Sequence, residues 1–150
     1  MRAIPTLSLI LTLVLVPFAA TAQPGGDAAD LFPELQGTMQ TSLPFTLSDG
    51  AGYSWDIQYD GSISDGVSDA FDGSMNVDVN GSFASFQGFG NILEGGREIA
   101  LPLTTTSGGL MIARRILIPA DDGYARFVEV LYNPSSSAMS PLARPSSTAA

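Results

Sequence analysis

The chain of 150 residues contains no cysteine, no histidine and no lysine. Without cysteine the chain can form no disulfide, so its stability must come mainly from core packing. It also cannot carry a lipid anchor on an N-terminal cysteine. Without histidine and cysteine, Ser-His-Asp and Cys-His nucleophile systems and the usual zinc sites are excluded. Carboxylates, hydroxyls and arginine are the groups left for chemistry.

Positive charge is scarce and unevenly distributed. Residues 23–150 hold five arginines and fifteen acidic residues, a formal charge of 5 − 15 = −10. Eleven of these acids and no base lie between Gln23 and Gly96. Because such a surface repels phosphate backbones, we expect no nucleic-acid partner.

Residues 1–22 have the pattern of a secretory signal peptide. Arg2 is followed by an apolar run from Leu7 to Leu15, and small residues end the segment at Ala20-Thr21-Ala22. The run is much shorter than the ~20 apolar residues of a membrane-spanning helix, and no second such run follows, so we expect no membrane span. We predict cleavage after Ala22 and a secreted or cell-surface location.

Alternation of apolar and polar residues predicts several half-buried strands. In the strand predicted at residues 97–103, Ile99, Leu101 and Leu103 are expected on one face. Asn80-Gly81 predicts a two-residue hairpin turn, which explains the pair better than the glycosylation sequon that it forms with Ser82. The predicted strands cover residues 53–59, 74–80, 83–87 and 97–103.

Residues 110–118 and 124–132 are apolar on both faces, which is typical of strands covered from two sides. Asp122-Gly123 predicts a tight hairpin between them. Since no segment has a sustained helical period, the fold class is predicted to be all-β, an antiparallel β-sandwich. Residues 23–40 are expected to form a flexible leader, and the Ser/Pro/Ala-rich residues 135–150 a disordered tail.

The ordered series WDIQYDGSISDGVSDAFDG, GREI and ARRILIPADDGYARFVEVLYNP resembles a β-sandwich module of unassigned function found in large bacterial exported and cell-surface proteins. The resemblance covers roughly residues 43–134, and its specificity lies in the combination and order of the motifs. Ser74 replaces a glycine that is usual in the module. Further strands normally follow the Asn-Pro pair, whereas Asn133-Pro134 here precede the tail. The resemblance therefore implies the N-terminal half of the module, over residues 41–134, with no catalytic residue.

An incomplete sandwich would leave one edge of the strand at residues 124–132 unpaired. Backbone donors and apolar surface would then be exposed together beside Val128, Val130 and Leu131. Such an edge invites pairing with another chain. We therefore expect self-association or strand pairing with another protein.

Four aspartates lie in the stretch YDGSISDGVSDAFDG, from Tyr59 to Gly73. The EF-hand spacing fails, because Asp65 stands where glycine is required. Turn formation explains the abundance of Asp and Gly, since both residues favour tight turns. The alternative is a weak calcium site, because clustered carboxylates repel one another unless they are splayed or bridged by a cation. No other cofactor is expected. The candidate calcium ligands are Asp60, Asp65, Asp69 and Asp72.

Two further patterns have a structural and a functional interpretation. Tyr53, Trp55 and Tyr59 share a strand face and could stack on a sugar, but Ile57 in the same row favours core packing. The neighbours Arg114 and Arg115 must point to opposite faces of their strand. For these arginines, structural ion pairs are favoured over a ligand clamp.

These features predict an exported, non-enzymatic β-sandwich module with a structural or surface-association role. A glycosidase would need two carboxyl groups about 5–9 Å apart across a sugar-binding cleft, and no sequence feature indicates one. The alternative function is a calcium-dependent carbohydrate-binding module, with carbohydrate as the partner.

Overall fold

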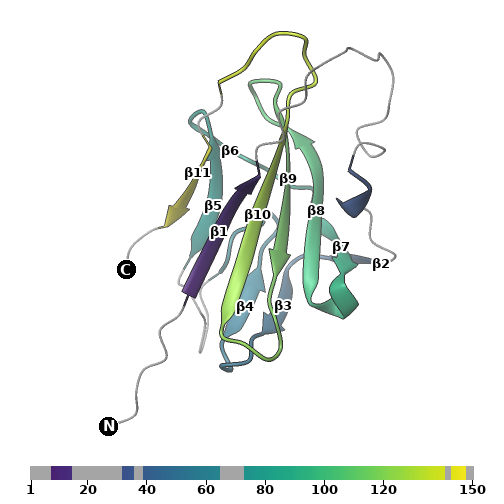
Figure 1. Ribbon diagram of the computed structural model, residues 1–150, viewed down its shortest axis with the longest axis vertical. Helices are drawn as coiled ribbons and strands as arrows, with labels where there is room; N and C mark the ends of the chain where they lie inside the picture. Colours follow the sequence, from purple (N-terminus) through teal and green to yellow (C-terminus); the bar gives the residue numbers. More distant parts are fainter. Residues whose placement is uncertain (1–7, 15–31, 36–38, 65–72, 141–142, 148–150) are drawn as a thin grey trace.

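The computed structural model describes residues 8–14, 32–35, 39–64, 73–140 and 143–147. Within these ranges the chain is all-β: strands β1 to β11 are accompanied only by two short 3-10 helices, η1 (Pro33–Leu35) and η2 (Glu94–Gly96). The strands form an antiparallel sandwich of two layers (Figure 1). The predicted fold class is confirmed.

The first layer is a sheet of six strands, described from one edge to the other. All neighbours pair antiparallel except β1 and β10, which run parallel. β1 lies at one edge of the sheet and β2 at the other. In spatial order the strands are β1 (Ser8–Val14), β10 (Tyr124–Tyr132), β9 (Met111–Leu117), β8 (Glu98–Thr105), β7 (Phe89–Leu93) and β2 (Met39–Ser42).

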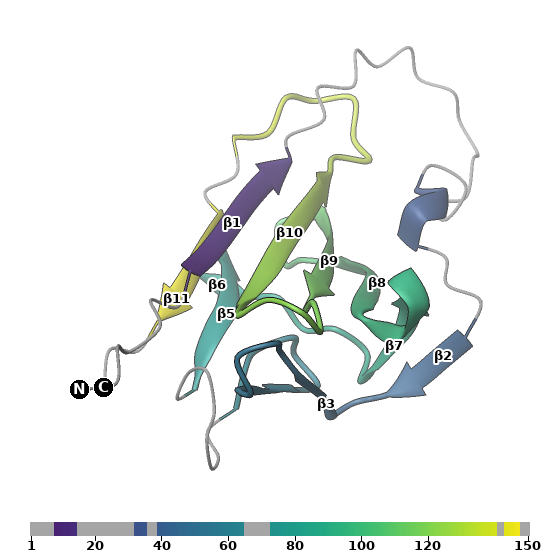
Figure 2. The ribbon, with the colours of Figure 1, turned by 60° about the horizontal axis from the view of Figure 1, so that its bottom comes forward.

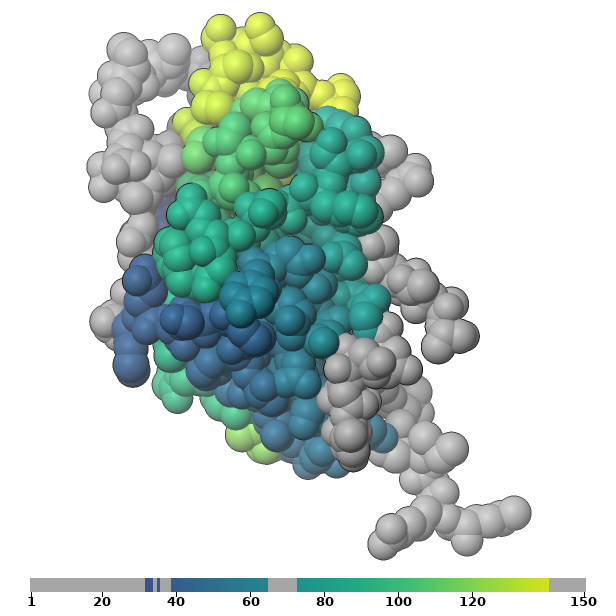
Figure 3. Space-filling view, turned by 180° about the vertical axis from the view of Figure 1, so that it is seen from behind, coloured from purple at the N-terminus to yellow at the C-terminus, as the bar shows by residue number. Residues whose placement is uncertain are grey.

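The second layer contains a three-stranded sheet and a hairpin. Ile63 joins them, because it forms bridges to Ile57 of the hairpin and to Ser74 of the sheet. Figure 2 separates the two layers, and Figure 3 shows the second layer covering the molecule from behind. The sheet has the order β11 (Ala143–Ser147), β5 (Ser74–Val79), β6 (Ser82–Phe83), and the hairpin consists of β3 (Phe45–Ser48) and β4 (Ser54–Ile57).

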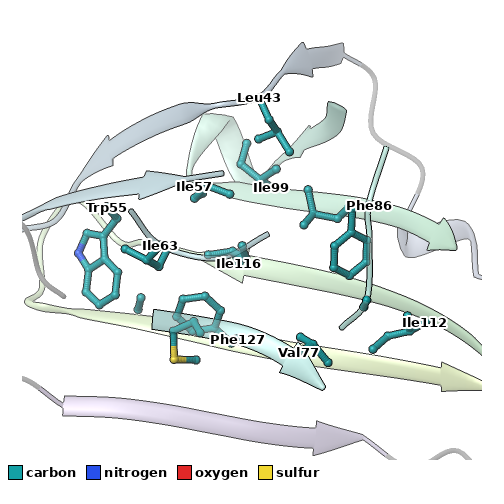
Figure 4. Packing of buried hydrophobic residues seen from close by; sticks show 14 of the residues in the cluster. Leu43, Trp55, Ile57, Ile63, Val77, Phe86, Ile99, Ile112, Ile116 and Phe127 are labelled. Atoms are coloured by element: carbon teal, nitrogen blue, oxygen red, sulfur yellow. The ribbon is translucent and has the colours of Figure 1, made fainter. Parts of the chain in front are cut away.

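The main core lies between the layers, where side chains of both meet (Figure 4). Trp55, Ile57 and Val77 from the second layer pack with Ile112 and Phe127 from the first. A smaller apolar cluster lies on the outer face of the six-stranded sheet. Its buried members are Phe32, Leu35, Ala100, Ala113 and Val130. β9 and β10 therefore bury apolar side chains on both faces, as their composition predicts.

The prediction that Leu103 shares a face with Ile99 and Leu101 is wrong. Leu101 pairs with Arg114 and Thr104 with Ile112, so two residues of β8 oppose a single residue of β9. This β-bulge contains Pro102 and shifts the alternation by one residue. Leu103 consequently packs against the outer cluster instead of the main core.

The two hairpin predictions have different outcomes. Asn80 and Gly81 both have positive φ, 54° and 82°, and connect β5 to β6 as a two-residue turn. β6 is shorter than predicted, since it ends at Phe83. The prediction of a tight turn at Asp122-Gly123 is wrong, because six residues, 118–123, separate β9 from β10. The loop bends there to meet the turn after β3, where the Gly50 amide donates to the Asp122 carbonyl oxygen at 2.8 Å.

Strands also occur in segments for which none was predicted. β1 falls inside the predicted signal peptide, and β2 begins within the predicted leader. Residues 133–140 contain neither helix nor strand, but Ala143–Ser147 pair with β5 as the edge strand β11. Pro145 is tolerated there because an edge strand has one side free of ladder hydrogen bonds.

Candidate functional site

Of the four candidate calcium ligands, only Asp60 belongs to the described part of the chain; Asp65, Asp69 and Asp72 lie outside it. The Asp60 carboxylate accepts hydrogen bonds from the Ser62 amide at 3.0 Å and from the Ser62 hydroxyl at 2.6 Å. This contact of an aspartate with the residue two positions later is the usual Asx turn. Among the described residues, no group of three or more acidic side chains is placed to hold a metal ion.

The Asp60 turn is fixed against the six-stranded sheet through Gly61. Its φ is +72°, a conformation that favours glycine. A Cβ atom at this position would lie 2.5 Å from a Leu101 methyl group and 3.3 Å from the Arg114 side chain. The turn can therefore approach the core only with glycine at position 61.

Arg114 points into the core and connects the two layers. Its guanidinium donates to Glu129 Oε1 at 2.9 Å through Nε, and to the carbonyl oxygens of Gly61 and Met75 through Nη1, both at 2.5 Å. It also lies 5.4 Å from the centre of the Phe127 ring, within cation–π range. Arg114 is completely buried. The Arg114 guanidinium therefore joins β9 to β10 and to the second layer.

Arg115 points to the opposite face, as predicted, and contacts a different acid. Its guanidinium binds Glu98 through two contacts, at 3.1 Å and 2.5 Å. Arg126 approaches the same carboxylate at 3.7 Å. Glu98 is completely buried although it lies on the outer face of the sheet. The interpretation of the arginine pair as structural ion pairs is confirmed for both residues.

The aromatic row of Tyr53, Trp55 and Tyr59, for which core packing is predicted and a sugar platform is the alternative, is divided between core and surface. Trp55 is 0 % exposed, and its indole N–H donates to Asp49 Oδ2 at 3.0 Å. Asp49 Oδ1 accepts from the amides of Ala51 and Tyr53, which closes the turn between β3 and β4. Tyr59, by contrast, is 58 % exposed. The core interpretation is confirmed for Trp55, which leaves no continuous aromatic surface along this strand.

The outward side of β10 is the backbone surface that the sequence predicts to be unpaired. Here it is occupied: Ser8–Val14 pair in parallel with Tyr124–Val130, residue by residue. We call this side of residues 124–130 the acceptor edge. In Figures 1 and 4, β1 runs alongside β10 in the same direction.

Three buried acids, Asp49, Glu98 and Glu129, were not singled out from the sequence. A signal for one of them exists. Glu129 alternates with Phe127 and Leu131, so it must enter the core with them. A carboxylate there requires a cationic partner, which the inward-facing arginine of the neighbouring strand supplies.

Comparison of the chain with known protein families, curated proteins and solved structures finds no match. In the described residues no helix is long and apolar enough to cross a membrane. The functional interpretation therefore depends on the sequence and the geometry of this chain.

Proposed function

We propose that the chain is an exported, non-enzymatic β-sandwich module with a structural or surface-association role, of the kind that residues 43–134 resemble. The proposal rests on the way in which the buried charged side chains of the chain are paired. Arg114 pairs with Glu129 and with carbonyl oxygens of the second layer, and Glu98 pairs with Arg115 of the adjacent strand β9 and with Arg126 of β10. These contacts hold the sandwich together.

A catalytic site needs its acid, base or cationic group to face a bound substrate. The buried carboxylates and Arg114 instead face one another or the backbone, as buried charges in a scaffold do. Export is supported by the N-terminal pattern of Arg2, an apolar run and small residues before Gln23. A stable module outside the cell fits both observations.

Export can be tested by expressing the full chain with a C-terminal tag in a bacterial host and measuring the intact mass in each cell fraction. We expect a product that begins at or near Gln23 in the exported or surface fraction. Leu11→Arg should block processing, because a charge interrupts the apolar run, whereas Leu11→Ile should not. A full-length product confined to the cytoplasm would overturn the proposal.

A further inference from the structure

We propose that, after removal of residues 1–22, the acceptor edge of β10 binds a parallel, apolar β-strand supplied by a different protein. This inference rests on the proposed export and processing. It concerns a backbone surface that is covered in the full chain by a segment which the mature chain would lack.

The first argument is the pairing itself. Seven consecutive residues of β10 are matched with β1, from Ser8 opposite Tyr124 to Val14 opposite Val130. The other side of β10 pairs with β9 from Arg126 to Tyr132. Loss of β1 would therefore turn an inner strand of the sheet into an edge with unpaired N–H and C=O groups.

The second argument is that β10 has the composition of an inner strand. It is nine residues long, and Ala125 and Phe127 are completely buried. Protected edges are short, polar or interrupted by proline. The opposite edge of the same sheet, β2, is four residues of sequence MQTS and mostly exposed, and the edge strand β11 carries Pro145. Of these three strands, β10 alone is both long and free of proline.

The occupant can be inferred from the strand that is seated there. Ser8–Val14, of sequence SLILTLV, has seven residues, no charge, and the β-branched residues Ile10, Thr12 and Val14. Such residues favour extended backbone. The partner strand should therefore be uncharged, rich in aliphatic residues and at least this long.

A second copy of the chain fits this edge less well. Each processed chain carries a formal charge of 5 − 15 = −10, so two copies repel each other. A second copy would also have to offer β10 itself, which carries Arg126 and Glu129, whereas the strand seated on the edge here carries no charge. We therefore assign the edge to a partner strand from another protein, and self-association becomes an outcome of the test.

The absence of cysteine makes disulfide trapping unambiguous. The probe is a synthetic peptide of residues 8–14 with Thr12→Cys and a soluble Gly-Ser-Lys tail. In the parallel register Thr12 lies opposite Val128. An antiparallel peptide centred on the same seven residues would place Thr12 opposite Arg126. The exported, processed chain is prepared in three versions, V128C, R126C and Y124C, and oxidised with the peptide.

We expect mixed disulfide to form on V128C at least about tenfold faster than on R126C or Y124C, since only directly opposed strand positions have the Cα separation of a disulfide. The Y124C site lies about 13 Å along the strand from position 128. A peptide with Leu11→Pro should lose the preference, because proline cannot complete the ladder. Equal rates at the three sites, or no reaction, would overturn the proposal.

One control variant and the mass of the exported product separate this proposal from the export on which it rests. The full chain carrying T12C and V128C should close an intramolecular disulfide, which tests the pairing without processing. If the product still begins at Met1 and stays in the cytoplasm, the export proposal fails while this pairing result stands. If the product is processed but forms V128C-linked dimers of doubled mass by light scattering, a second copy is the occupant and the partner-strand assignment is wrong.

Discussion

At the scale of single residues, Arg114 shows how a charged side chain can belong to an apolar core. Its Nε and Nη atoms face one carboxylate and two carbonyl oxygens, from Glu129, Gly61 and Met75. A buried ion pair is often no more stabilising than well-packed apolar residues of equal volume, but removal of one partner leaves the other charge uncompensated. The contribution of Arg114 is therefore visible mainly when it is removed alone.

We predict that Arg114→Met lowers the free energy of unfolding by about 3–5 kcal/mol, measured by chemical denaturation. Glu129 would remain buried without its cation, and two carbonyl oxygens would lose their donor. The double variant R114M/E129L should recover part of this loss, because the buried charge is gone. Asp121→Asn, at an exposed position, should change stability by less than about 0.5 kcal/mol. A single variant as stable as the parent would contradict the role assigned to Arg114.

The residue scale also marks a limit of sequence reasoning. The opposite directions of Arg114 and Arg115 follow from strand geometry alone and are confirmed. Their partners follow only in part. The inward direction of Glu129 can be read from its alternation with Phe127 and Leu131, whereas Glu98 is identified only once the order of β8, β9 and β10 is known. Asp49 likewise reads as a turn residue in the sequence, and its bond to Trp55 depends on the folded hairpin.

At the scale of elements, local signals were sufficient where they govern the backbone directly. Asn80-Gly81 favours positive φ and forms the predicted hairpin, and the alternation of Met75, Val77 and Val79 places all three in the core. Asp122-Gly123 is the counterexample. The Gly50 amide donates a hydrogen bond to the Asp122 carbonyl oxygen, so a tertiary contact replaces the local turn. The bulge around Pro102 likewise depends on the partner strand.

The hairpin provides a prediction with a matched control. Gly81 has a φ of 82°, and an added Cβ would meet no atom within 4 Å. Gly81→Ala should therefore destabilise the fold only through its backbone, by about 1–2 kcal/mol. Gly108 is equally open but has no positive φ, so Gly108→Ala should be neutral or stabilising by up to about 1 kcal/mol. Equal effects in thermal unfolding would show that the backbone conformation at Gly81 is not the cause.

At the scale of the whole molecule, charge is unevenly distributed over the strands. β3 to β6 contain Asp56 and Asp78 and no basic residue, whereas Arg114, Arg115 and Arg126 lie on β9 and β10. Arg114 reaches from the six-stranded sheet to a backbone acceptor of β5. Repulsion among the unpaired acids should make stability depend on ionic strength, since exposed charges are screened by salt. This effect of ionic strength on stability has to be separated from the effect of calcium bound at a specific site.

The last prediction makes that separation. The Asp60 Oδ1 atom accepts the hydrogen bonds of a turn with Ser62. Asp65, Asp69 and Asp72 lie outside the described residues, and for them turn formation stays the prediction from the sequence. We therefore expect CaCl2 and NaCl, at equal ionic strength, to raise the melting temperature by the same amount. A calcium site filled at a hundred times its Kd would add about 2.7 kcal/mol, which corresponds to a further shift on the order of 10 °C. If such a calcium-specific shift occurs, and is lost in D65A or D69A but not in D121A, the aspartates bind calcium and the interpretation as turn formers is wrong.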